Sequence, residues 1–358
     1  MLQLVQLYRA AAILLVLLFH AGLVVRGRYG TTPLADLWEI GFSGVHLFFV
    51  LSGFIILSAH REDINRPAQL PRYLARRLAR IYPLYWMVFF VFGGWRLFSG
   101  QLPGLDFFTN ALIFHSKVKQ VVQVSWTLAH EMVFYLIFAL LIVSRRLGIL
   151  VMSLWLLATF IQGPRPAAVV LNPINIEFGF GLFAAWLCGR LQPLSDRHRN
   201  RLGSAALALG ILGFLATSVW VRKEPDALLY WYRHPIPVYG YGLSSALLLL
   251  ASISPRLEAL AGRNEGLVAI GNASYAIYLV HLPFEKMASD LFKKVPLIWQ
   301  PEAATEVRAA VLWLGVSTLA LGAGLLVHRL IEKPLVFSWL RRSIDRQFPR
   351  NRQQSSSQ

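Results

Sequence analysis

The chain has 358 residues, of which 56% are hydrophobic and only 15% charged, with a mean hydropathy of +0.52. This composition excludes an ordinary soluble globular protein, in which about 25% of residues are charged, and it points to a lipid bilayer as the solvent. The formal net charge of +17 does not indicate a nucleic-acid-binding protein, because the basic residues are scattered through short loops. A single cysteine excludes an internal disulfide and a cysteine-based metal site, and no metal is expected.

Apolar runs follow one another from the N-terminus almost to the C-terminus. A spanning helix needs about 20 mainly apolar residues, whereas a barrel strand alternates over about 10 residues, so these continuous runs predict helices. Placing the basic loops inside puts both termini in the cytoplasm. We expect an all-α, polytopic membrane helix bundle of about ten transmembrane helices. The predicted spans are 4–25, 38–58, 81–99, 126–144, 147–162, 169–189, 203–221, 236–253, 267–287 and 309–329.

These spans predict one membrane domain over residues 1–336. The last residues, 337–358, are basic and polar, a composition that predicts a disordered cytoplasmic tail. The first run, 4–25, is too long for a signal-peptide core and has no small-residue cleavage site after it, so we interpret it as a retained helix.

The first predicted helix carries Arg9 and His20. Eleven residues are close to three helical turns, so both side chains lie on one face, about 16 Å apart along the axis. Ionisable groups inside a membrane are costly and are often functional. A snorkelling anchor for Arg9 and an interfacial position for His20 are the structural alternatives. Histidine is also the residue type best suited to general-base catalysis near neutral pH.

The second predicted span mixes small residues with one polar residue, His46. We favour helix packing over a functional role for Ser43, Gly44, Ser52 and Gly53, because small residues permit close helix contact. His46 is harder to explain by packing, since it sits within the span.

A basic segment precedes the third span. Its arginines are helically spaced with Tyr73 and Leu74 between them, which predicts an amphipathic helix at the membrane surface. The arginines are Arg72, Arg76, Arg77 and Arg80.

Two further polar stripes lie on apolar helices. Glu131 is expected to be the only carboxylate well inside a predicted span, with Tyr135 one turn further on the same face. Ser274, Tyr278 and His281 follow at positions i, i+4 and i+7 of a later span and form a stripe typical of a lined cavity. The alternatives are a structural partner for Glu131 and interhelical hydrogen bonds for the second stripe.

Six blocks in this order resemble the acyltransferase-3 family of integral membrane O-acyltransferases. The resemblance runs from about residue 5 to 336. The first block is a basic residue followed after ten positions by histidine, which Arg9 and His20 match. The others are 44–56 (GVHLFFVLSGFII), 76–83 (RRLARIYP), 125–135 (SWTLAHEMVFY, which includes Trp126), 274–281 (SYAIYLVH) and 332–334 (EKP).

The resemblance implies an enzyme that moves an acyl group, commonly acetyl from acetyl-CoA, onto a hydroxyl of a cell-envelope or extracellular carbohydrate. It implies His20 as the catalytic base and Glu131 as a second catalytic residue. It also implies a cavity lined by the polar residues of the matched blocks. These are His46, Ser52, Trp126, Tyr135, Ser274, Tyr278 and His281.

The expected donor, acyl-CoA, carries several phosphates, which Arg9 and the arginines at 72, 76, 77 and 80 can hold by charge-assisted hydrogen bonds. The structural alternative for each arginine of this basic segment is a positive-inside anchor at the cytoplasmic surface. The other expected partners are the lipid bilayer, the carbohydrate acceptor and a separate extracytoplasmic protein that handles the acyl group. No nucleic acid is expected. The implied location is the bacterial cytoplasmic (inner) membrane, spanned many times.

Two other functions fit some of the residues. A proton-coupled secondary transporter, or a flippase-like permease, would use Arg9, Glu131 and His281 along a substrate path. We rank it lower because the sequence shows neither inverted repeats nor paired broken helices. A scaffold without activity would leave the polar stripes unexplained.

Overall fold

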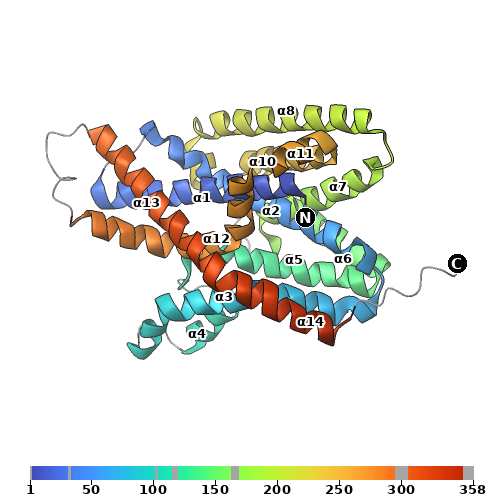
Figure 1. Ribbon diagram of the computed structural model, residues 1–358, viewed down its shortest axis with the longest axis horizontal. Helices are drawn as coiled ribbons and strands as arrows, with labels where there is room; N and C mark the ends of the chain where they lie inside the picture. The colour runs from blue at the N-terminus through green and yellow to red at the C-terminus, as the bar shows by residue number, and fades with distance from the viewer. Residues whose placement is uncertain are drawn as a thin grey trace. The chain divides into compact units, whose positions relative to one another are not determined.

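A computed structural model describes residues 2–30, 34–100, 104–114, 120–162, 169–294 and 305–349 (Figure 1). All regular elements within these ranges are helices. Eight helical segments of the described residues are long and apolar enough to cross a membrane. The expectation of an all-α polytopic membrane protein is therefore confirmed.

The helices fall into two compact units. Unit 1 contains residues 1–59 and 156–325, and unit 2 contains residues 60–155 and 326–358. The helices of unit 1 are α1 (Gln3–Tyr29), η1 (Leu34–Phe42), α2 (Ser43–His60), η5 (Val169–Leu171), η6 (Pro173–Asn175), α7 (Ile176–Leu191), α8 (Asp196–Val221), α9 (Pro225–Leu229), α10 (Pro235–Leu250), η7 (Ala251–Ile253), α11 (Pro255–Gly262), α12 (Glu265–Phe292) and α13 (Thr305–Val327).

Unit 2 is built from two segments that are distant in sequence. Its helices are η2 (Arg61–Asp63), η3 (Pro67–Gln69), α3 (Leu70–Phe98), α4 (Gly104–Ala111), η4 (Gln123–Ser125), α5 (Trp126–Val143), the first part of α6 (Arg145–Gln162), the π-helical segment η9 (His328–Leu340) and α14 (Arg341–Gln347).

Each of the ten predicted spans overlaps a helix, but two of these helices are not among the eight segments. They are α3, whose first half holds four arginines, and α7, which has only 16 residues. The number of helices that cross the bilayer and the cytoplasmic placement of both termini remain predictions.

The C-terminal segment differs from the expected disordered tail. Residues 337–347 are helical, in η9 and α14, and Ile344 is buried. The helix continues because Ile344 provides an apolar anchor within an otherwise charged sequence. Residues 350–358 lie outside the described residues.

The most extensive helix–helix contact of unit 1 is between α1 and α12, which lie side by side (Figure 1). The two helices run parallel, since Arg9 near the start of α1 contacts Ser274, and Tyr29 at its end contacts Ser289. Close approach depends on glycine: a Cβ on Gly271 would lie 2.1 Å from the backbone oxygen of Gln6. The packing role predicted for small residues of the second span holds at Gly44, where a Cβ would lie 2.3 Å from a backbone oxygen of α1.

Candidate active site

A histidine pair joins α1 to α12. His281 is fully buried, His20 is partly buried, and His281 Nε2 lies 3.3 Å from His20 Nδ1. Their ring centroids are 4.9 Å apart and nearly perpendicular, at 67°. The two stripes predicted on separate helices therefore face each other, and they meet at His20, the expected base, and His281, an expected cavity residue.

The neighbouring carbonyl groups determine which ring nitrogen carries the proton. A carbonyl oxygen only accepts hydrogen bonds, so His281 Nδ1, 2.7 Å from the Tyr278 oxygen, donates its N–H. Neutral His281 then has an unprotonated Nε2, which accepts from His20 Nδ1. His20 Nδ1 also lies 2.9 Å from the carbonyl oxygen of Val16, so it is a donor in either contact. This tautomer leaves the lone pair of neutral His20 on Nε2, the nitrogen that a general base needs.

A second contact between the same helices involves Arg9. Its Nη2 donates to Ser274 Oγ at 2.8 Å, and its Nη1 donates to Gln6 Oε1 at 3.1 Å. The predicted stripe on the first helix thus meets the predicted stripe on α12 at two levels. Tyr278 completes the latter stripe, with its ring 5.8 Å from that of His281.

His46 pairs with a residue that the sequence analysis missed. Its Nδ1 hydrogen-bonds Glu177 Oε1 on α7, and both side chains are completely buried. Three aromatic rings surround the imidazole: Phe42, Trp231 and Tyr241, with centroids 5.2 to 5.9 Å away.

The expectation that Glu131 is the only carboxylate inside a predicted span is wrong. Glu177 on α7 and Glu285 on α12 are both fully buried. Glu177 lies in the first turn of α7, two residues after the turn at Pro173–Asn175 and within the predicted span 169–189. Ser52, which was grouped with the cavity residues, lies on α2 and is partly buried.

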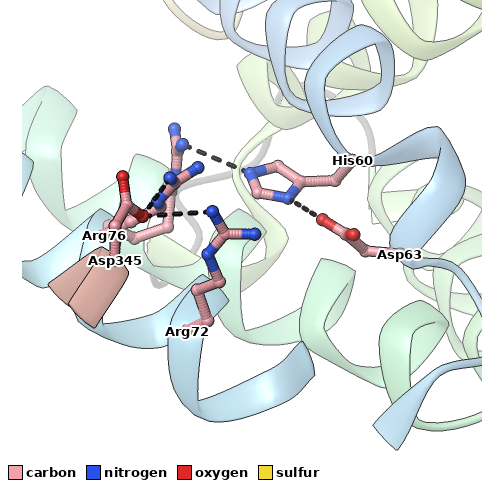
Figure 2. A network of polar contacts seen from close by, with 6 residues as sticks. His60, Asp63, Arg72, Arg76 and Asp345 are labelled. Atoms are coloured by element: carbon pink, nitrogen blue, oxygen red, sulfur yellow. Dashed lines mark hydrogen bonds and ion pairs between the residues drawn. The ribbon is translucent and has the colours of Figure 1, made fainter. Parts of the chain in front are cut away.

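In unit 2 the predicted basic segment forms a network of ion pairs (Figure 2). Arg72 and Arg76 both donate to Asp345 Oδ1 of α14, at 3.1 Å for Arg72. Burial lowers the pKa of the Arg76 guanidinium, and the hydrogen bond to Asp345 opposes this shift. The network continues from Arg77 to the imidazole of His60.

The rest of the network ties the basic helix to nearby carboxylates. His60 Nε2 lies 3.3 Å from Arg77 Nη2, and its Nδ1 lies 2.8 Å from Asp63 Oδ2 (Figure 2). Arg80 Nη1 donates to Glu332 Oε1 at 2.6 Å, and Glu332 Oε2 contacts His328. The predicted surface helix is not a separate element, because α3 continues through Pro83 into the third predicted span.

The expected cavity residues of α5 also lie in unit 2. Tyr135 donates its hydroxyl hydrogen to Glu131, as their one-turn spacing predicted. The Arg77 guanidinium lies over the Tyr135 ring, 5.7 Å from its centroid. Trp126 starts α5 and packs edge-on against His130, at 5.7 Å.

The structure therefore groups most of the predicted site residues into two sets, while His46 and Ser52 lie on α2 outside both. Arg9, Ser274, Tyr278, His20 and His281 lie together between α1 and α12. The second set belongs to α3 and α5 of unit 2 and contains Arg72, Arg76, Arg77, Arg80, Trp126, Glu131 and Tyr135. Across the described ranges, no three His, Cys, Asp or Glu side chains gather into a metal site.

Comparison with known proteins adds independent information. The acyltransferase-3 family model, described as an acyltransferase domain, matches residues 5–327. The exopolysaccharide production protein ExoZ of Rhizobium meliloti is 29% identical over 84% of this chain and 90% of its own length. The acyltransferase MdmB of Streptomyces mycarofaciens is 27% identical over 85% of this chain and 83% of its length.

A third relative is matched over less of its own length. The peptidoglycan O-acetyltransferase OatA of Listeria monocytogenes is 24% identical over 73% of this chain, which corresponds to 47% of that protein. No solved structure matches the chain. The match to the family model covers the α1 and α12 residues described above.

Proposed function

Because this chain belongs to the acyltransferase-3 family, we propose that it transfers an acyl group, acetyl in the first instance, from acyl-CoA to a carbohydrate hydroxyl, with His20 as the base. Two of these relatives are named as acyltransferases, and one of the two acts on peptidoglycan. The third is named for exopolysaccharide production. The bacterial inner membrane is the proposed location.

The observation that carries this proposal is the His20–His281 pair. His281 accepts the hydrogen bond of His20 Nδ1–H and so keeps the lone pair of His20 on Nε2. His20 Nε2 removes the proton of the acceptor hydroxyl while the hydroxyl oxygen attacks the thioester carbonyl carbon. The C–O bond of the ester forms and the C–S bond breaks. The CoA thiolate then takes the proton from the His20 imidazolium, which restores the neutral pair.

The arginines are proposed to bind the donor. Coenzyme A phosphates are anionic, and guanidinium groups bind phosphate with two parallel hydrogen bonds. Arg72 and Arg76 already bind a carboxylate of this chain, which has similar acceptor oxygens. Arg9 donates to Ser274 and Gln6, and it lies on the same face of α1 as His20.

The experiment measures base-labile acyl ester on envelope and secreted carbohydrate by mass spectrometry. Cells lacking the protein are compared with cells that produce wild type or His20→Ala at matched levels. We expect wild type to restore the ester and His20→Ala to lower it by about 10²- to 10⁴-fold, the usual contribution of a general base. Equal ester in all strains refutes the proposal and favours transport assays. Full ester with His20→Ala refutes the role of His20 alone.

A further inference from the structure

The buried pair of His46 and Glu177 has no part in the transfer step derived above. Both side chains are fully buried, and each keeps one polar atom without a hydrogen-bond partner among the described residues, namely His46 Nε2 and Glu177 Oε2. The hydroxyl of Ser43, one turn before His46, is also buried without a hydrogen-bond partner among the described residues. Buried polar atoms are nearly always satisfied, so these exceptions require an explanation.

The protonation state of the pair decides whether its two unpaired atoms donate or accept hydrogen bonds. When Glu177 is ionised, its Oε1 can only accept, so His46 Nδ1 donates to it and the neutral imidazole has an unprotonated Nε2. Nε2 and Oε2 are then both hydrogen-bond acceptors. A ligand that presents two neighbouring hydroxyl groups supplies the donors that this pair lacks.

The surroundings of the pair are aromatic. Phe42 and Trp231 stack on each other with centroids 5.1 Å apart, and each ring packs edge-on against His46. The hydroxyl of Tyr241 donates a hydrogen bond to Ser218 Oγ at 3.1 Å, which fixes the position of the Tyr241 ring. A few polar acceptors among aromatic rings are typical of a small-molecule site, and rings cover the apolar C–H faces of a sugar.

The pair is also connected to the proposed base through aromatic contacts. The ring of Phe19 packs edge-on against His20 at 5.1 Å and against Phe42 at 6.2 Å. Phe42 in turn lies 5.9 Å from His46. The pair is therefore separated from His20 by two rings within the same unit.

We propose that His46 and Glu177, with the rings of Phe42 and Trp231, form a subsite for the acceptor, where two adjacent sugar hydroxyls donate to His46 Nε2 and Glu177 Oε2. This assignment rests on the proposed function and extends it, since it places vicinal hydroxyls among the groups that the enzyme recognises. The chemistry occurs at His20, and the subsite holds a part of the sugar that does not react.

The test is a steady-state assay with membranes that contain wild type, Glu177→Gln or Trp231→Phe. The donor is labelled acetyl-CoA, and the acceptor is the carbohydrate fraction that gains ester in the cellular experiment, isolated from cells lacking the protein. Glu177→Gln keeps the size of the side chain and removes its charge, and Trp231→Phe keeps a ring. The matched control is Trp186→Phe, at an exposed tryptophan on the same helix as Glu177.

We expect both subsite variants to raise the half-saturating acceptor concentration, about tenfold or more for Glu177→Gln because a charged acceptor is lost. The half-saturating acetyl-CoA concentration stays within about twofold, and the Trp186 control behaves as wild type. Unchanged acceptor dependence, or equal changes for donor and acceptor, overturns the subsite. If Glu177→Gln does not fold, the acceptor dependence of Trp231→Phe alone tests the subsite. Absence of ester with wild type refutes the proposed function itself.

Discussion

Replacing Asp345 by Asn is expected to strengthen donor binding. Asp345 Oδ1 accepts hydrogen bonds from Arg72 and Arg76, the two arginines proposed to bind the phosphates of coenzyme A. A carboxylate in this position competes with a phosphate for the same guanidinium groups. Its removal frees both arginines without changing the volume of the side chain at position 345.

The size of the effect follows from the exposure of the three side chains. Asp345 is 37% exposed, whereas Arg72 is 13% and Arg76 is 25% exposed. Exposed ion pairs contribute about 0.2 to 1 kcal/mol each, and solvent screening at Asp345 places these two in the lower half of that range. Two such pairs amount to roughly 0.4 to 1 kcal/mol, so the Kd for coenzyme A should fall about two- to fivefold.

The assay is equilibrium binding of coenzyme A to the purified full-length protein in detergent, at low and high salt. The gain should shrink at high salt, because exposed ion pairs are screened. Asp196→Asn, which removes a surface ion pair to Arg199, serves as the control and should leave the Kd unchanged. Weaker binding of coenzyme A by Asp345→Asn refutes competition and assigns Asp345 to orienting the arginines.

Two other variants test the α1–α12 contact. Arg9→Ala should raise the Kd for acetyl-CoA about tenfold, since one charge-assisted hydrogen bond to an anionic ligand is lost, and an unchanged Kd in the same binding assay counts against its role. Gly271→Leu should lower the thermal inactivation midpoint of the purified protein, because a Cβ at this position would lie 2.1 Å from the Gln6 backbone oxygen. Overpacking of this kind destabilises the folded protein by about 1 to 3 kcal/mol. The control is Gly266→Leu on the same helix, where a Cβ meets nothing within 4 Å, and equal loss in both variants contradicts the packing argument.

The helical membrane architecture was predictable from the sequence because it depends on local properties. Run length and apolarity decide whether a segment can be a membrane helix, and every predicted span overlaps a helix. The one-turn contact between Glu131 and Tyr135 is local in the same way. The basic segment was recognised from its spacing, but its partner Asp345 lies some 270 residues later and has no sequence signal, so it was assigned to a disordered tail.

Contacts between distant helices could not be predicted from a single chain. The spacing of Arg9 and His20 predicts a shared face, yet it does not say which helix that face meets. Glu177 lies within the predicted span 169–189, but its partner His46 is 131 positions away, so no local pattern links the two residues. A carboxylate within an apolar run is nevertheless a usable signal, because burying it in a membrane costs free energy unless another polar group pairs with it.

Parallel contact between α1 and α12 has a consequence for how sequences of this kind can change. Arg9 and His20 each meet their own partner on α12, so the number of residues between them is coupled to the orientation of both side chains. One inserted residue would turn the second side chain by about 100° around the helix and carry it away from its partner. Substitutions between the two positions are compatible with this geometry, whereas insertions and deletions of a single residue are not.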